Sequence, residues 1–319
     1  MQNKVTFASQ IKEELISEVD LSTERLQALL SAYIRINAVL SFENKKTTVI
    51  LKTEKAKIAR FLYSSLKKIK EDVDVRLDFV RKNNRKKTFY HVIISDADDL
   101  LDYLSVSFFE GKIPKDVVYN DETISGYLAG AFLATGSINS PKTSNYHLEI
   151  TTVSENYAKW LAKLFPKYKK IEMTPKITKR RDRYVIYFKK SDQISNFLIM
   201  IGATNCCMEF EDMRAYRDFT NNTNRLANLD YANMERTMDV AKRQIKEIKY
   251  IDDVLGIHNF HNQKKELLCY FRLDNESLSM QDLADKLSEE LGIKVSKSNV
   301  NHLFRDIHDL YVKLKGKHI

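Results

Sequence analysis

Lysine and arginine side chains cluster at two places in the chain, and these clusters have the clearest chemical potential. Residues 81–87 read RKNNRKK, and residues 179–183 read KRRDR. Ammonium and guanidinium groups bind phosphate, the guanidinium through two parallel hydrogen bonds. Both clusters therefore predict contact with a polyanion, and the candidate phosphate-binding residues are Lys82, Arg85, Lys86, Lys87, Lys179, Arg180, Arg181 and Arg183.

A third polar cluster, SKSNVNHLFRDI at residues 296–307, has helical spacing. Val300, Leu303 and Ile307 fall on one side, which leaves the polar residues for solvent or a ligand. Asparagine pairs with adenine edges, and lysine or arginine binds guanine or phosphate. The candidate DNA-binding residues are Ser296, Lys297, Ser298, Asn299, Asn301, His302 and Arg305. A structural or protein-binding helical hairpin would show the same pattern.

The cysteines and histidines do not indicate a metal site, a disulfide framework or a catalytic triad. The three cysteines are odd in number and two are adjacent, at Cys206 and Cys207, so no CxxC motif exists. The seven histidines are scattered along the chain. We therefore expect no metal, no cofactor and no enzymatic activity.

The positive charge of the chain lies in bands. Lys and Arg exceed Asp and Glu by 52 to 43 overall, for a net charge of +9. Residues 45–91 carry 15 basic and 5 acidic residues, and residues 136–190 carry 13 and 4. Two basic bands at matching positions suggest a repeated structural unit rather than one solvated face.

Hydrophobic periodicity supports a repeat with an offset of about 98 residues. Each copy reads helix, two strand positions, helix, two strands, helix. The first copy is predicted at Glu24–Leu40, a weak strand in SFEN, Thr47–Lys52, Glu54–Lys70, Val73–Val80, Thr88–Ile94 and an acidic helix at DADDLLDYL. The second is predicted at Thr123–Ala134, a weak strand in SINS, YHLEITTV, Ser154–Leu164, strands near Ile171–Thr178 and Tyr184–Phe188, and Gln193–Ile201.

The remaining chain predicts a linker and a helical module. The polar segment Phe219–Ala232 precedes a helix at Asn233–Asp252. Arg225 and Arg243 in this stretch are candidate phosphate contacts, although a solvated helical linker would look the same. A lead helix at Asn259–Leu273 follows, and then a helix capped by Ser279 with Asp282 in the capping-box position, a turn at Gly292 and a helix from Ser296.

The second copy opens with LAGAFLATG, Leu128 to Gly136, which resembles the signature helix of LAGLIDADG homing endonucleases. LSAYIRINA, Leu30 to Ala38, stands at the equivalent place in the first copy. The resemblance implies two helices packed at the centre of a saddle of antiparallel strands that lies along duplex DNA. The family holds divalent metal with an acidic residue before the final motif position, but here those positions are Asn37 and Thr135. Glu43 and Asp121 are the nearby carboxylates that could substitute.

YLAGAFLATGSINSPKTSNYHLEI, NRLANLDYANMERTMDVAKRQIKEI, SKSNVNHLFRDI and FASQIKEEL resemble the WhiA family of bacterial regulators over nearly the full length. That resemblance implies an α+β fold, in which a duplicated αββαββα LAGLIDADG-like saddle domain is joined by a helical linker to an all-α helix-turn-helix domain. We expect an N-terminal extension at 1–22, repeats at 23–118 and 119–218, a linker at 219–256 and the helix-turn-helix at 257–319.

The resemblance also implies a function. We expect a sequence-specific DNA-binding transcriptional regulator linked to cell division or chromosome functions, with sporulation in spore-forming relatives, and without nuclease activity. Its expected partner is double-stranded promoter DNA, with RNA polymerase or another regulator as candidate protein partners. We expect a monomer in the cytoplasm, associated with the nucleoid and not with a membrane. An active homing-type endonuclease and an RNA- or ribosome-associated protein are the alternatives.

Overall fold

The structure, a computed structural model, describes residues 5–17, 21–43, 46–82, 87–108, 116–143 and 145–317. The chain divides into two compact units, Met1–Arg217 and Asp218–Ile319. Among the described residues, no helix is long and apolar enough to cross a membrane.

The N-terminal unit contains one helix, α1 (Phe7–Ser17), followed by two copies of the same arrangement. The first copy consists of α2 (Thr23–Asn37), β1 (Ala38–Glu43), β2 (Lys46–Thr53), α3 (Ala56–Ile69), β3 (Asp74–Lys82), β4 (Lys87–Ser95) and α4 (Asp98–Tyr103). The second consists of α5 (Asp121–Thr135), β5 (Ser137–Ile138), β6 (Leu148–Thr152), α6 (Glu155–Ala162), a 3-10 turn (Phe165–Lys167), β7 (Lys176–Arg180), β8 (Arg183–Phe188) and α7 (Ser191–Ile201).

Each copy builds a four-stranded antiparallel sheet with the same topology. The strand orders are β1-β2-β4-β3 and β5-β6-β8-β7. The predicted α+β class and the duplicated αββαββα order are therefore confirmed, including the weakly predicted first strands. Several boundaries differ from the predictions, including the end of the first helix and the start of β7. The helix expected to reach Leu40 ends at Asn37, because Val39 and Leu40 pair with Ile50 and Val49 of β2. Strand β7 begins at Lys176, whereas the sequence predicted a strand from about Ile171.

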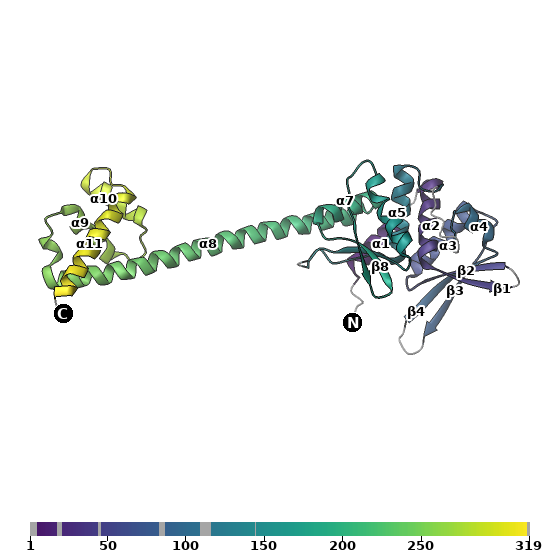
Figure 1. Cartoon of the computed structure of the whole chain (residues 1–319), viewed down its shortest axis with the longest axis horizontal. Helices are drawn as coiled ribbons and strands as arrows, with labels where there is room; N and C mark the ends of the chain where they lie inside the picture. The colour runs from purple at the N-terminus through teal and green to yellow at the C-terminus, as the bar shows by residue number, and fades with distance from the viewer. Residues whose placement is uncertain are drawn as a thin grey trace. The chain divides into compact units, whose positions relative to one another are not determined.

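The two copies meet along α2 and α5, which lie side by side (Figure 1). Gly126 and Gly130 of α5 allow this approach, because a Cβ at Gly130 would lie 2.0 Å from the carbonyl oxygen of Leu29. A Cβ at Gly126 would lie 2.5 Å from the carbonyl oxygen of Arg25. Apolar residues of both sheets, such as Val49, Val92 and Ile150, bury one sheet face in the same core.

A single helix, α8 (Thr204–Leu255), contains all but the last residue of the segment 219–256, which was expected to be a linker. The helix runs without a break through residues 219–232, the polar segment ahead of the helix expected at Asn233–Asp252. The segment contains no glycine or proline, so nothing in it interrupts helical hydrogen bonding. The first turn of α8 is held by Glu14 of α1, whose carboxylate oxygens accept hydrogen bonds from the backbone nitrogens of Asn205 at 2.7 Å and Cys206 at 2.9 Å.

The C-terminal unit packs three helices against the second part of α8. They are α9 (Gln263–Asp274), α10 (Met280–Leu291) and α11 (Lys297–Lys317), with a 3-10 turn at Ile257–Asn259 before α9. Their shared core is apolar and is separate from that of the first unit. It contains Ile248, Ile251, Leu268, Leu283, Leu287, Val300, Leu303 and Ile307.

Candidate nucleic-acid interface

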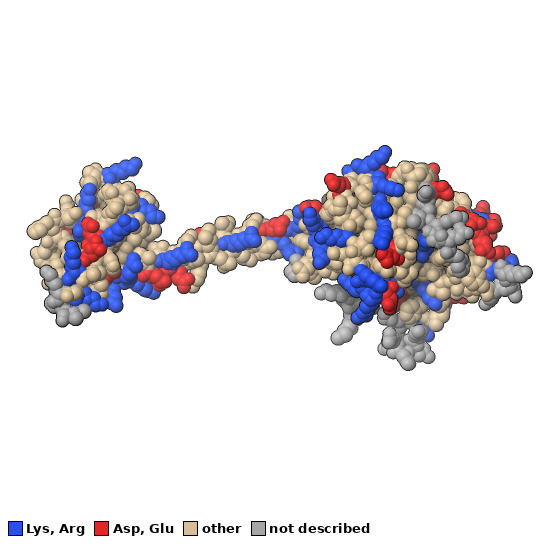
Figure 2. Space-filling model, in the orientation of Figure 1, with Lys and Arg blue, Asp and Glu red and all other residues tan. Residues whose placement is uncertain are grey.

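The β7–β8 hairpin presents the second basic cluster at its tip. Arg180 and Arg183 are opposite each other in the backbone register of the hairpin. Arg181 lies in the turn between them, with φ = 54°. That left-handed conformation costs a non-glycine residue about 1–2 kcal/mol, so a bulky cation occupies a position that favours glycine. Lys179, Arg180, Arg181 and Arg183 are all exposed. Figure 2 shows Lys and Arg side chains gathered over this hairpin.

Sequence reasoning did not select Glu149, which contacts Arg180 directly, or His147, which contacts Glu149. Glu149 on β6 pairs with Arg180, with 3.2 Å between Oε2 and Nη1, and also with His147, with 2.9 Å between Oε2 and Nε2. The Glu149 side chain is only 18% exposed. His147 and Glu149 are two residues apart in the predicted strand YHLEITTV, a spacing that places side chains on the same sheet face, and this was the signal available in the sequence.

The first basic cluster occupies the equivalent hairpin of the first copy. Lys82 and Lys87 form the last pair of the β3–β4 register. The structure describes their backbone positions but not their side chains, and Arg85 and Lys86 lie outside the described residues. The duplicated topology thus brings Lys82 and Lys87 to the place in the first sheet that Arg180 and Arg183 occupy in the second.

The positions of the nuclease metal ligands carry uncharged side chains with neighbours of their own. Thr135 donates a hydrogen bond from Oγ1 to the carbonyl oxygen of Thr151 at 2.7 Å, and the Asn37 Nδ2 lies 3.5 Å from the Tyr33 hydroxyl. Asp121 begins α5, at the opposite end from Thr135, and accepts a hydrogen bond from the Lys169 backbone. The side chain of Glu43 lies outside the described part. Within the described residues, no group of three His, Cys, Asp or Glu side chains is arranged to hold a metal ion.

Three lysines and one carboxylate lie at the Asn37 position, and that carboxylate, Glu13, pairs with Lys57 at 2.6 Å. Asn37 lines a pocket of about 270 Å³ together with Lys12, Lys52 and Lys55, beside Leu133 and Ala134 of α5. Burial lowers the pKa of Lys12 to about 8. Sequence reasoning missed these lysines, because they come from α1, β2 and the start of α3, and only the fold brings them together.

The helix-turn-helix has the caps and the turn that its sequence predicts, although its lead helix begins at Gln263 rather than Asn259. Ser279 and Asp282 form a reciprocal capping box at the start of α10, and Gly292 ends that helix with φ = 62°. The hydroxyl of Ser296 accepts a hydrogen bond from the backbone nitrogen of Asn299 at 3.2 Å and so caps α11. These local contacts fix where α11, the predicted recognition helix, begins.

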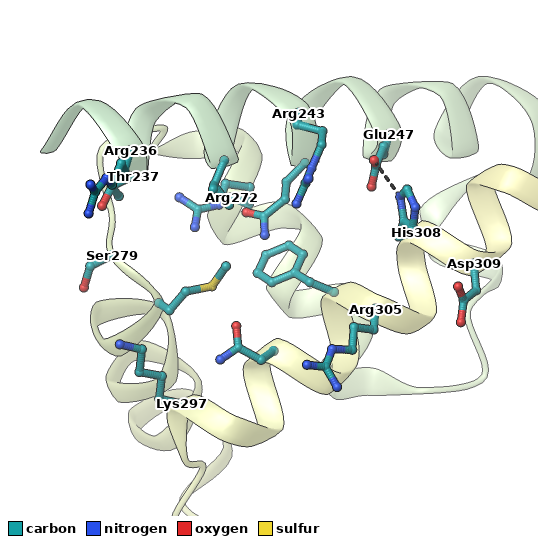
Figure 3. A pocket seen from close by; sticks show the side chains of 15 residues that line it. Arg236, Thr237, Arg243, Glu247, Arg272, Ser279, Lys297, Arg305, His308 and Asp309 are labelled. Carbon is teal, nitrogen blue, oxygen red and sulfur yellow. Dashed lines mark hydrogen bonds and ion pairs between the residues drawn. The ribbon is translucent and has the colours of Figure 1, made fainter. Parts of the chain in front are cut away.

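The candidate residues on α11 fall into two rows. Ser298, Asn299 and His302 are exposed on the side opposite the buried core residues. Lys297, Asn301 and Arg305 follow one another at intervals of four, and they line a pocket with Arg243 of α8 (Figure 3). Arg225 is exposed on α8 and does not line this pocket.

Domain comparisons match three consecutive parts of the chain. Residues 23–107 match the WhiA N-terminal LAGLIDADG-like domain, residues 124–220 the WhiA LAGLIDADG-like domain, and residues 223–311 the WhiA C-terminal HTH domain. The last match includes the second part of α8.

Full-length relatives give the same result. "Probable cell division protein WhiA" of Staphylococcus carnosus is 36% identical over 321 residues, which cover 99% of both chains. Its namesake in Staphylococcus aureus (strain JH9) is 35% identical over 317 residues, or 98% of both chains. The crystal structure of full-length WhiA from Thermotoga maritima shares this fold, with a TM-score of 0.59, 22% identity and coverage of 97% and 98%.

Proposed function

The chain belongs to the WhiA family, and from that premise we propose that it is a sequence-specific DNA-binding transcriptional regulator that does not cleave DNA. The observation that carries the proposal is the exposed polar row Ser298, Asn299 and His302 on α11. In a helix-turn-helix, the second helix can enter the major groove, where short polar side chains on its exposed face can form hydrogen bonds with base edges.

The two units would contribute differently to DNA binding. The β7–β8 and β3–β4 hairpins supply cations to phosphates without regard to sequence, through Lys179, Arg180, Arg181, Arg183 and the first basic cluster. Helix α11 supplies base contacts, with Ser296 positioning its first turn. Arg225 and Arg243 add phosphate contacts from α8.

Binding without cleavage follows from the degenerate metal positions. In-line attack on a phosphodiester requires carboxylates that place divalent ions, whereas Asn37 and Thr135 are uncharged and Lys12, Lys52 and Lys55 lie beside Asn37. Ammonium groups at this place can neutralise a phosphate but cannot activate water as a metal ion does.

The cellular role rests on the relatives. Proteins that are 35–36% identical over the whole chain are named for cell division, and we extend that role to this protein, with promoter DNA as its main partner. Residence at the nucleoid, action as a monomer and contact with RNA polymerase or another regulator belong to the same proposal.

Selection from a random duplex library, followed by fluorescence anisotropy, tests the DNA-binding proposal. The wild-type protein should enrich a defined motif. The triple variant Arg180→Ala, Arg181→Ala, Arg183→Ala should bind all duplexes more weakly and reduce the slope of log K against log salt by about 2–3. Asn299→Ala should instead reduce the preference for the motif over random duplex, by about 1–3 kcal/mol.

The matched control for the triple arginine variant also removes three positive charges from the N-terminal unit, but away from the hairpin. Lys167, Lys169 and Lys170 are exposed near the Asp121 end of α5, and their triple alanine variant should keep the wild-type salt slope. Failure to enrich any motif, or equal loss of sequence preference in both DNA-binding variants, would contradict the proposal. Protein-dependent nicking of supercoiled plasmid with magnesium or manganese would contradict its non-cleaving part.

A further inference from the structure

A pocket of about 610 Å³ lies within the C-terminal unit, between α8, the start of α10 and α11. Five of its lining side chains are cationic, and they come from α8, α9 and α11: Arg236, Arg243, Arg272, Lys297 and Arg305. Figure 3 shows these side chains around the space between α8 and α11. A pocket of this size accommodates a small organic ligand.

The cations are only partly neutralised from within. Two carboxylates line the pocket, Glu247 and Asp309. The carboxylate of Glu247 is engaged by His308, with 2.8 Å between Oε1 and Nδ1. The lining thus carries three more cations than carboxylates even with His308 neutral, which favours an anionic ligand.

Two buried side chains at the pocket have hydrogen-bonding atoms without a partner. Arg272 is only 1% exposed; its Nη1 donates to the carbonyl oxygens of Glu276 at 3.3 Å and Leu278 at 2.7 Å, but its Nε has no partner. Gln244 is 4% exposed, and its Oε1 is also unpartnered. Buried polar atoms are normally hydrogen-bonded, and a buried charge normally has a counter-charge.

The pocket also offers an apolar surface. Phe304 and Met280 line it together with Val240, and the Arg272 guanidinium carbon lies 5.7 Å from the centroid of the Phe304 ring. An aromatic ring beside buried arginine suits a ligand with a planar group and a phosphate. Lys297 and Arg305 are exposed to duplex DNA, whereas Arg272, at 1% exposed, lines the pocket and faces only a group that enters it.

We propose that this pocket binds a nucleoside phosphate, with the phosphate on Arg272, Arg243 and Arg305 and the base against Phe304 and Met280. The unpartnered Gln244 Oε1 is an acceptor for an amino group of the base. Lys297, Asn301 and Arg305 also belong to the DNA-binding set, so the regulatory part of the inference rests on the proposed function. A bound nucleotide engages Arg243 and Arg305, which are both in the DNA-binding set, and so competes with DNA.

Calorimetric titration of the full-length protein tests the pocket without DNA. ATP, GTP, AMP and inorganic phosphate are the probes, in buffer free of divalent metal. At least one nucleotide should bind, and Arg272→Met and Arg243→Gln should each weaken it about tenfold or more, because each removes a charged hydrogen-bond donor. Arg243 is exposed, so its variant keeps the test valid if Arg272→Met fails to fold.

Lys242→Gln is the matched control, since Lys242 is exposed next to Arg243 on α8 but does not line this pocket. Its affinity for the nucleotide should equal that of the wild type. Absence of nucleotide binding, or equal binding by Arg243→Gln and the wild type, overturns the pocket proposal. Phosphate that binds as tightly as the nucleotide overturns the base contact.

Anisotropy with the selected duplex then separates the two proposals. Nucleotide at a few times its wild-type Kd should weaken wild-type DNA binding several-fold and should affect Arg243→Gln much less, because the variant binds the nucleotide about tenfold more weakly. A nucleotide that binds the pocket without displacing the duplex overturns competition but not the site. DNA binding that is absent even without nucleotide contradicts the proposed function, whereas the calorimetric result stands by itself.

Discussion

Replacing Gly130 with alanine tests how the two copies of the N-terminal unit are joined. The new Cβ would lie 2.0 Å from the carbonyl oxygen of Leu29 and under 3 Å from the Leu29 carbonyl carbon and Cα. All three atoms belong to the backbone of α2. Ordinary contact begins at 3.4 Å, so α2 and α5 would have to separate by about 1.4 Å in a close-packed core.

The expected net cost is about 2 kcal/mol. Overpacking a core costs about 1–3 kcal/mol, and the upper end applies because a backbone cannot rotate away as a side chain can. Alanine offsets about 1 kcal/mol of this through its higher helix propensity. With a urea dependence of about 2 kcal/mol per molar, the unfolding midpoint should fall by about 1 M.

Trp160 makes the measurement specific to the N-terminal unit. It is the single tryptophan of the chain, and its ring lies 5.2 Å, centroid to centroid, from Tyr127 of α5. Its fluorescence in a urea titration therefore reports unfolding around α5 without a contribution from tryptophan in the C-terminal unit. This separation matters because a protein of two units need not unfold in a single step.

Gly316→Ala provides the control. Gly316 lies in α11, and a Cβ there meets no atom within 4 Å. This variant should leave the Trp160 midpoint unchanged. If Gly130→Ala keeps the native fluorescence and unfolds at the same or a higher urea concentration than the wild type, then the close approach of α2 and α5 does not require glycine, and the reasoning is refuted.

Two further predictions concern Ser279 and Lys12. Ser279→Ala removes the cap of α10 and should cost about 1 kcal/mol, seen as faster amide exchange in α10 with no change at Trp160; unchanged exchange would show that the cap is dispensable. Burial lowers the pKa of Lys12 to about 8 from 10.5, so the folded state binds fewer protons than the unfolded state between these pH values, and stability should rise as pH increases through this window. In urea titrations read at Trp160, Lys12→Met should lack this rise, and the same rise in both proteins would rule out Lys12 as its source.

The sequence was most informative where a short segment determines its own conformation. The Ser279–Asp282 capping box, the Gly292 turn and the Ser296 cap each depend on contacts within a few residues. The alternation in the strands also predicted the two sheets, since one face of each is buried in a common core. The end of α2 at Asn37 was not predictable from periodicity, because Val39 and Leu40 suit a helix as well as a strand.

Features that depend on distant segments were missed. Glu14 holds the first turn of α8 from about 190 residues away in sequence. Lys12, Lys52 and Lys55 surround Asn37 only after α1, β2 and α3 have packed. The buried guanidinium of Arg272 likewise gave no signal, since one arginine in an amphipathic helix is usually exposed.

The turn of the β7–β8 hairpin affects which amino-acid substitutions selection would favour in this protein. With φ = 54°, Arg181 is strained where glycine would be relaxed, so substitution by glycine gains stability and loses a charge that we propose binds phosphate. The stability optimum and the binding optimum therefore require different residues at this one position. Selection for heat resistance alone would remove this arginine, and only selection for binding a polyanion would retain it.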